Sequence, residues 1–280
     1  MSSLVASDLF SLRGKTIILT GASGFLGRTM ARVLLANGAR VVALGRNARL
    51  LERVAEWSEE FGSESVVARQ VDMYDLDALS KVLDAIVAEE GRVDVVVNNA
   101  HELGPATGFN TPSGSLESGT FDQWTRNFTG GVYWPALIAQ KVGAGMKTRG
   151  SGSLINVASM YAVVAPSPQL YAGTTALNPP GYSASKAALV AFTRYLASFW
   201  GPFGIRANAL LPGPFSNTED DGPNSVSKDD PLVARLHART CLGRTGRPSE
   251  LAGALLLLAS DASSYMTGHS LIVDGGWTVT

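Results

Sequence analysis

Short runs of branched apolar residues alternate along this chain with longer segments whose apolar residues recur at helical spacing. The runs that we expect to be strands are Lys15–Thr20, Arg40–Leu44, Val66–Val71, Val93–Val97, Ser153–Val157, Arg206–Leu211 and Ser270–Val273. The expected helices are Gly27–Asn37, Ala48–Phe61, Asp75–Glu90, Thr120–Lys147, Tyr182–Trp200 and Pro248–Ala259. Strands rich in Val and Ile that each precede a helix form a parallel sheet covered on both faces. The alternation therefore predicts a doubly wound α/β fold.

A single domain over residues 1–280 is the simplest organisation, because the sequence holds no repeat, low-complexity tract or break in composition. Its 45% hydrophobic and 17% charged residues are typical of a compact core. Two irregular segments, Ala165–Pro180 and Phe215–Pro231, interrupt the alternation. We expect them to be loops that contact the substrate, within about residues 160–181 and 214–231.

The composition excludes several classes of partner. A net charge of −1 without a basic cluster argues against nucleic acid. No apolar run approaches the roughly 20 residues that cross a bilayer, so no membrane association is expected. Met1–Leu12 lacks the pattern of a signal peptide, and Cys241 is the only cysteine. A cytoplasmic protein without a metal site is the expectation.

The segment Thr20–Gly27 follows the first expected strand and opens the first helix. Glycine lets a backbone approach a pyrophosphate closely, and a helix N-terminus favours negative charge. This turn predicts a dinucleotide-binding Rossmann fold, with a plain tight turn as the alternative. The residues expected to contact the cofactor here are Gly21, Ser23, Gly24, Phe25, Leu26 and Gly27.

The end of the second strand favours NADP over NAD. It continues as Gly45-Arg46-Asn47, without the acid that would bind a ribose 2′-hydroxyl. Arg46 can form a charge-assisted contact with a 2′-phosphate. The alternative is that Arg46 is a solvated cation of the loop.

Further motifs follow the glycine turn in a fixed order. They are Asp72, Asn98-Asn99-Ala100, Asn127, Ser159, Tyr182-Ser183-Ala184-Ser185-Lys186, Pro212-Gly213 and Asp274-Gly275-Gly276. Together they resemble the short-chain dehydrogenase/reductase family, in its shorter, single-domain oxidoreductase type. The resemblance implies hydride transfer between a nicotinamide and a carbonyl or secondary alcohol.

The resemblance also implies roles for four residues. Tyr182 is the general acid or base, and Lys186 lies on the same helix face, four residues on. We expect Lys186 and an oxidised nicotinamide to lower the pKa of Tyr182, and Lys186 to contact the nicotinamide ribose. Ser159 would donate to the same substrate oxygen. Asn127 would hold a water that links the lysine to solvent. An ordinary core aromatic at Tyr182 and a helix-surface amide at Asn127 are the alternatives.

The remaining cofactor positions also follow from the resemblance. Asp72 and Met73 would flank the adenine, Asn98 and Ala100 the adenosine, and Pro212 and Gly213 the nicotinamide. Thr218 would bind the carboxamide or a phosphate. Together with Tyr182 and Lys186, the further positions expected to contact the cofactor are Asp72, Met73, Asn98, Ala100, Pro212, Gly213, Phe215 and Thr218. Asn98 and Asn99 can also cap the end of their strand.

Three features depart from the family pattern. The Gly21, Gly24, Gly27 spacing resembles the extended subfamily of epimerases and dehydratases, which leaves open an isomerase or lyase with a tightly held cofactor. A cofactor-binding sensor or scaffold is a further alternative.

The second departure is His101, which stands where glycine is usual. A local hydrogen bond is favoured for it over contact with cofactor or substrate.

The third departure is the distance between Ser159 and Tyr182, which are 23 positions apart. Tyr171 stands at the more usual distance, but Thr175 rather than lysine follows it by four residues. We therefore assign the acid to Tyr182 and interpret Ala165–Pro180 as an insertion.

The two loops carry polar side chains, which favours a polar, hydroxylated substrate, although exposed loops are often polar anyway. The stretches Met160–Pro166 and Tyr171–Thr174 resemble sugar, nucleotide-sugar and gluconate dehydrogenase-like members. The resemblance also implies a homotetramer or homodimer paired through Thr120–Lys147 and Tyr182–Trp200. The apolar residues considered for that interface, or alternatively for simple core packing, are Trp134, Leu137, Phe192, Leu196 and Phe199.

Overall fold

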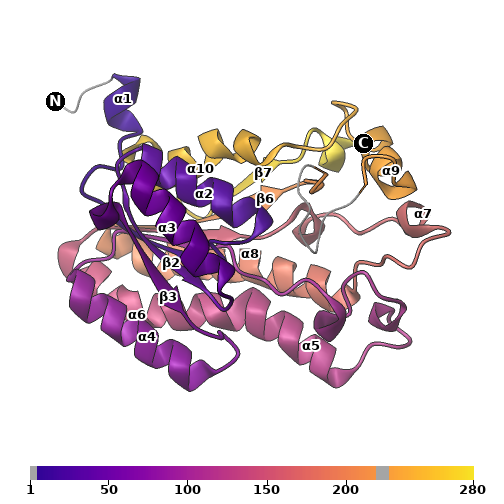
Figure 1. Ribbon diagram of the computed structural model, residues 1–280, viewed down its shortest axis with the longest axis horizontal. Helices are drawn as coiled ribbons and strands as arrows, with labels where there is room; N and C mark the ends of the chain where they lie inside the picture. Colours follow the sequence, from indigo (N-terminus) through magenta and orange to yellow (C-terminus); the bar gives the residue numbers. More distant parts are fainter. Residues whose placement is uncertain (1–4, 219–226) are drawn as a thin grey trace.

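A computed structural model describes residues 5–218 and 227–280 (Figure 1). Its centre is a sheet of seven parallel strands in the order β3-β2-β1-β4-β5-β6-β7. The strands are β1 (Thr16–Thr20), β2 (Arg40–Gly45), β3 (Val66–Gln70), β4 (Val95–Asn98), β5 (Gly152–Val157), β6 (Ile205–Pro212) and β7 (Ser270–Val273). All the expected strands are present, so the doubly wound α/β prediction is confirmed.

Helices cover both faces of the sheet, because successive strand residues point to opposite sides. Ile17 and Leu19 of β1 pack with one group of helices, and Ile18 between them packs with the other. The first group is α2 (Phe25–Ala36), α3 (Arg49–Phe61) and α10 (Ala252–Ala259). The second is α4 (Leu76–Glu90), α6 (Trp134–Arg149) and α8 (Pro180–Trp200). Figure 1 shows α2 and α10 on one side of the strands and α4 and α6 on the other.

The expected helix Thr120–Lys147 is divided in the structure. It consists of α5 (Phe121–Phe128), a π-helical turn (Thr129–Tyr133) and α6. Pro135 has no N–H with which to continue an α-helical ladder across this point. Gly131 lies so close to α8 that a Cβ there would be 2.7 Å from that of Ser185. The π turn therefore brings the segment that carries Asn127 directly against α8.

The first expected loop is tied down at its centre. Ala165–Pro180 contains a short helix, α7 (Pro168–Tyr171), and it packs against α9 (Pro231–Ala238), which the sequence analysis did not anticipate. Arg235 of α9 donates to the carbonyl oxygens of Leu170, at 2.9 Å, and Ala172, at 2.6 Å. Figure 1 shows α7 and α9 at the same end of the molecule. Of the second expected loop, residues 219–226 lie outside the described residues, as do residues 1–4 of the N-terminal segment.

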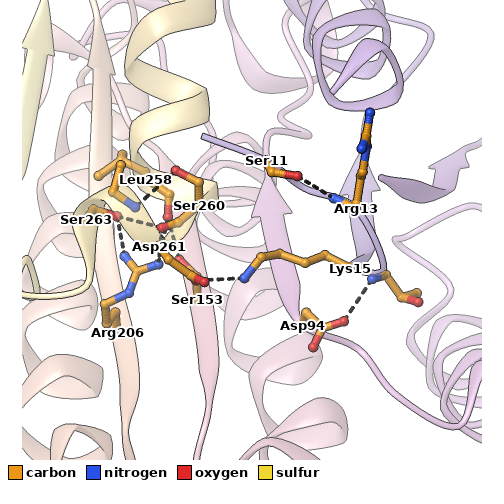
Figure 2. Close-up of polar contacts among 12 residues, drawn as sticks. Ser11, Arg13, Lys15, Asp94, Ser153, Arg206, Leu258, Ser260, Asp261 and Ser263 are labelled. Atoms are coloured by element: carbon orange, nitrogen blue, oxygen red, sulfur yellow. Dashed lines mark hydrogen bonds and ion pairs between the residues drawn. The ribbon is translucent and has the colours of Figure 1, made fainter. Parts of the chain in front are cut away.

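A network of polar side chains links the elements at the end of the sheet where the strands begin (Figure 2). The guanidinium of Arg206 donates to the carbonyl oxygens of Leu258 and Ser260 at the end of α10, where a cation interacts favourably with the helix dipole. Ser153 of β5 donates to Leu258 as well, at 2.8 Å. Asp94 accepts from the N–H of Thr16 at 2.9 Å, linking the starts of β4 and β1. All of these bonds lie at the end of the sheet where the strands begin. The candidate site lies at the opposite end, where the strands finish.

Within the described ranges, no helix is both long and apolar enough to cross a membrane. The same residues contain no cluster of His, Cys, Asp or Glu side chains suited to a metal ion.

Candidate active site

The order of the strands creates a crevice at the end of the sheet. The chain runs outward from β1 to β3 and then returns to place β4 on the other side of β1. Connections therefore leave the ends of β1 and β4 in opposite directions, and ligands of open α/β sheets bind in the crevice that results. The glycine turn lies at the end of β1, and Asn98-Asn99-Ala100 at the end of β4.

The glycine turn has no room for side chains at two of its glycines. Gly21 has a φ of +66°, and a Cβ on it would lie 3.0 Å from the Cα of Ala100. A Cβ on Gly27 would lie 2.0 Å from the carbonyl oxygen of Gly21. No side chain caps the N-terminus of α2, which begins after Gly24. The turn thus presents uncapped backbone N–H groups in a tight cradle that suits a pyrophosphate.

Thr20 and Asn99 join β1 to β4 beside this cradle. The Thr20 hydroxyl accepts from the backbone N–H groups of Asn99, at 3.0 Å, and Ala100, at 2.9 Å. The amide of Asn99 donates in return to the carbonyl oxygens of Thr20 and Gly21. Asn98 donates to Asn156 on β5 at 2.8 Å, and its own buried Oδ1 has no hydrogen-bond partner. Both asparagines thus brace the strand end, and Asn98 keeps one acceptor unused.

Arg46 lies at the exposed end of β2, where its guanidinium pairs with Glu102 at 3.0 Å. Glu102 also pairs with Arg126 of α5, at 3.1 Å. Since Arg46 follows β2 and Glu102 follows β4, the Arg46–Glu102 ion pair spans the end of β1. The Arg46 side chain is 56% exposed, so it is a solvated cation of the loop that also forms an ion pair, and its contact with a 2′-phosphate stays a prediction.

Ser159, Tyr182 and Lys186 come together where β5 ends against α8. The buried ammonium of Lys186 donates to the carbonyl oxygen of Val157 at 2.9 Å and lies 5.6 Å from the centre of the Tyr182 ring. Ser159 hydrogen-bonds to the Tyr182 hydroxyl and lowers its pKa, but burial outweighs this and raises that pKa to about 12. Burial also lowers the pKa of Lys186 to about 7.

These values run against the expected lowering of the Tyr182 pKa by Lys186. A buried lysine with a pKa near 7 is charged only part of the time at neutral pH, so it stabilises a phenolate weakly. The polypeptide by itself thus keeps Tyr182 protonated. The positive charge of an oxidised nicotinamide is the other half of that expectation, and its effect stays a prediction.

Asn127 is buried, so the surface-amide alternative is wrong. Its amide nitrogen donates to the carbonyl oxygens of Thr107, at 2.9 Å, and Gln123, at 2.8 Å. Its oxygen faces Nε2 of His101 at 3.3 Å. The polar atoms of the side chain are therefore already engaged within the protein, and its proposed link to a water stays a prediction.

His101 occupies a more central place than the sequence analysis gave it. As the favoured interpretation expects, His101 is a loop residue with a hydrogen-bonding contact, here with Asn127. It also packs edge-on against Tyr182 with ring centres 5.0 Å apart, a contact that the sequence analysis did not anticipate. Phe109 packs against the same ring at 5.3 Å. Burial, and secondarily the charge of Lys186, lower the pKa of His101 well below its usual value, so its imidazole is neutral. Its departure from the usual glycine was the signal for this role.

Tyr161 and Tyr171, which the sequence analysis did not assign to the site, lie beside Tyr182. Tyr161 follows Ser159 in a 3₁₀ turn and donates its backbone N–H to the serine hydroxyl at 3.1 Å. The hydroxyls of Tyr161 and Tyr171 hydrogen-bond to each other, and burial raises both pKa values. Tyr171 thus pairs with a tyrosine rather than a lysine.

The other predicted cofactor positions line the ends of β3 and β6. Asp72 is exposed and accepts from the N–H of Tyr74, while Met73 is buried in the core. Gly213, after Pro212, packs so tightly that a Cβ would lie 2.4 Å from the Cα of Asp274. The ring of Phe215 packs against Gly246 and the core. Next to Thr218, the buried Oδ1 of Asn217 has no hydrogen-bond partner.

Comparisons with known proteins show which proteins this chain is similar to. A family model described as enoyl-(acyl carrier protein) reductase matches residues 21–278. The sorbose reductase sou1 of Schizosaccharomyces pombe is 37% identical over 277 residues, which cover 97% of this chain and 98% of the relative. The gluconate 5-dehydrogenase of Gluconobacter oxydans is 33% identical over 273 residues and 98% of each chain. A crystal structure of a gluconate 5-dehydrogenase from Burkholderia cenocepacia, in complex with NADP and tartrate, superposes with a TM-score of 0.82 at 30% identity, covering 99% of this chain and 100% of that one.

Burial of Lys186 makes the stability of the fold depend on pH. In the folded chain its pKa is about 7, against 10.5 for an ordinary lysine, so between these values the unfolded chain binds more protons. The free energy of unfolding should therefore rise with pH above 7, by up to about 1.4 kcal/mol per pH unit. Urea denaturation at pH 6.5 to 9 measures this rise. In a Lys186→Met variant the rise should be smaller, and equal slopes for the two proteins would contradict the assignment.

Proposed function

This chain belongs to the short-chain dehydrogenase/reductase family, and we propose that Ser159, Tyr182 and Lys186 carry its reaction, with Asn127 positioned behind them. It is an NAD(P)-dependent oxidoreductase that interconverts a carbonyl and a secondary alcohol on a hydroxylated substrate. The convergence of a protonated tyrosine, a serine hydroxyl and a buried lysine at the end of β5 is the observation that supports this catalytic set.

A nicotinamide cofactor held by this chain would supply the hydride for reduction of a ketone and would accept it in the reverse direction. Tyr182 gives its hydroxyl proton to the ketone oxygen, which becomes the alcohol oxygen, and in oxidation it takes that proton back. Ser159 donates a hydrogen bond to the same oxygen and so stabilises the negative charge that develops there. Lys186, with a pKa of about 7, can pass a proton toward Tyr182 near neutral pH. His101 and Phe109 hold the tyrosine ring in place from two sides.

The residues at the crevice suit a dinucleotide. The uncapped α2 N-terminus and the Gly21–Gly27 cradle would hold the pyrophosphate. The unused acceptors of Asn98 and Asn217 would receive donors from the cofactor. Asp72, Ala100, Pro212, Gly213 and Thr218 complete the proposed surface. Met73 is buried in the core and the partly buried Phe215 packs against the core, so we propose that they support this surface from behind.

A preference for NADP rests on Arg46. In the structure its guanidinium is already paired with Glu102, so a 2′-phosphate must compete with that carboxylate. Glu102 can release Arg46 without being left unpaired, because Arg126 remains its partner at 3.1 Å. A phosphate that binds both arms of a guanidinium makes the stronger contact. We therefore propose an exchange of partners when NADP binds.

The proposal also includes the class of substrate and the cellular location. The substrate is a sugar, polyol or sugar acid, supported by the names of the similar proteins and by tyrosine hydroxyls next to Tyr182. The location is cytoplasmic, where NADP(H) would be supplied and where the free thiol of Cys241 would stay reduced. The alternatives of an isomerase or lyase, or of a scaffold without turnover, have no support in the proteins that this chain resembles.

Tyr182→Phe should lower kcat by about 10²–10⁴-fold, because it removes the proton that the reaction transfers. Tyr171→Phe, which tests the other candidate tyrosine, should cost less than about tenfold. Tyr265→Phe, at a fully exposed side chain outside the proposed site and interface, serves as the matched control. Rates are followed by NADPH absorbance on a panel of ketoses and keto acids. Full turnover by Tyr182→Phe would overturn the proposed mechanism.

Arg46→Ala should weaken NADP⁺ binding by about 10–100-fold and leave NAD⁺ binding within about threefold. Glu102→Gln removes the competing carboxylate and should tighten NADP⁺ binding several-fold. Isothermal titration calorimetry measures both, with Arg53→Ala on the exposed face of α3 as control. If Arg46→Ala binds NADP⁺ as tightly as the unaltered protein, the assignment of Arg46 fails.

We also propose a homotetramer, although two residues considered for its interface are buried in the monomer core. Trp134 is 5% exposed and Leu196 is 3% exposed, so neither is available to a partner. Other aromatic side chains of α5, the π turn and α8 are exposed: Phe121, Phe128, Tyr133, Tyr195 and Phe199. This apolar surface is what a partner subunit would cover.

Light scattering should give a mass of about four times the 29.4 kDa of one chain. Phe121→Ser, at a side chain that is 87% exposed, should shift the population toward smaller species without loss of secondary structure. A monomeric mass for the unaltered protein would reject the assembly.

A further inference from the structure

Arg239 is a cation without a counter-ion in the part of the chain that the structure describes. It follows α9, and its guanidinium lies over the ring of the buried Trp277, 5.0 Å from the ring centre. Its Nε is buried and makes no hydrogen bond. Two neighbouring arginines differ, since Arg235 donates to two carbonyl oxygens and Arg244 pairs with Glu250 at 2.6 Å. Arg239 thus carries a buried Nε–H donor that is unused, and a buried donor without a partner costs free energy that an anion bound there would recover.

Arg239 is connected to Tyr182 of the proposed active site through the side chains of Trp277 and Tyr161. Tyr161 packs edge-on against Trp277 with ring centres 6.5 Å apart, and the charge of Arg239 opposes the upward shift of the Tyr161 pKa. Tyr161 in turn follows Ser159, hydrogen-bonds to Tyr171, and is close enough to influence the pKa of Tyr182. A row of hydroxyl groups therefore leads from the reacting end of the site to the arginine.

We propose that Arg239 binds the carboxylate of the substrate, so that the enzyme acts on polyhydroxylated acids and their keto forms in preference to neutral sugars. This inference rests on the proposed function of Ser159, Tyr182 and Lys186. A guanidinium presents two parallel N–H donors that match the two oxygens of a carboxylate, and the indole face of Trp277 holds it in a fixed plane. The hydroxyls of Tyr161 and Tyr171 contact the hydroxyl groups of the sugar chain between the two ends.

The cofactor is the other anion that enters this protein, but its phosphates are expected elsewhere. The pyrophosphate cradle lies between β1 and α2. Arg239 instead lies against Trp277, a residue that follows β7 in the chain. The 2′-phosphate position is expected at Arg46, after β2. In the sheet order, three strands lie between β2 and β6 and four between β2 and β7. If Arg239 nonetheless served the cofactor, its removal would weaken NADP⁺ binding.

The test compares two substrates that differ at one terminal carbon. 5-Keto-D-gluconate and L-sorbose share the same ketone and hydroxyl configuration, but one ends in a carboxylate and the other in a hydroxymethyl group. The full-length enzyme should show a higher kcat/KM for the keto acid. Arg239→Ala should lower kcat/KM for the keto acid about a hundredfold, mainly through KM, and change that for L-sorbose by less than about threefold. Arg239→Lys should recover part of the loss.

Two controls separate this role from a structural one. Arg244→Ala, which removes an arginine whose charge is already balanced, should leave the ratio of the two substrates unchanged. Binding is measured separately by calorimetry, with D-gluconate and D-glucitol in the presence of NADP⁺. D-gluconate should bind more tightly than D-glucitol, and Arg239→Ala should remove the difference while NADP⁺ affinity stays the same.

Several outcomes would overturn the inference. They are equal losses on both substrates in Arg239→Ala, equal binding of D-gluconate and D-glucitol to the unaltered protein, or weakened NADP⁺ binding in the variant. An enzyme that reduces L-sorbose but not the keto acid would reject the carboxylate site and leave the proposed oxidoreductase intact. Turnover that survives Tyr182→Phe would reject the proposed mechanism, while the binding comparison would still decide the role of Arg239.

Discussion

The hydroxyl of Thr20 joins the ends of β1 and β4, the two strands that flank the crevice of this protein. It accepts two backbone N–H groups from the segment after β4, at the one place where the order of strands reverses. The adjacent glycine turn has no space for a side chain at Gly27, and the close approach of Gly21 to Ala100 leaves little between the ends of β1 and β4. His101 and Glu102 come directly after the two residues that this junction holds.

Burial governs the chemistry of the site more than charge does. Lys186 and Tyr182 are both shifted toward their neutral forms, and His101 is neutral beside them. A site without fixed charge favours a proton donor that is loaded before the substrate arrives. The charged groups lie at its margins instead. Arg46 with Glu102 stands where the adenosine end of a dinucleotide is expected, and Arg239 lies beyond the tyrosines.

The sequence predicted the sheet and the glycine turn well, because both depend on local pattern. Branched apolar runs specify buried strands, and a glycine with positive φ specifies a tight turn. The π turn within Thr120–Lys147 and the helix α9 were missed, since one depends on packing against α8 and the other on contact with the loop.

The predicted catalytic residues were found together, but their environment was not foreseen. The sign of the Tyr182 shift depends on how deeply α8 is buried, which periodicity cannot specify. Likewise, the roles suggested by contacts of Arg239, His101 and Glu102 involve partners far away in the sequence, and a single sequence gives no signal for such pairs.

The tie between Arg235 and the segment after Ser159 has a consequence for how such enzymes diversify. Arg235 binds the main-chain oxygens of Leu170 and Ala172, and a main-chain oxygen is present whatever residue occupies the position. The anchor therefore places few demands on the identity of the residues that it fixes. The side chains of the segment Ala165–Pro180 can change under selection for a new substrate while its main chain stays attached to α9.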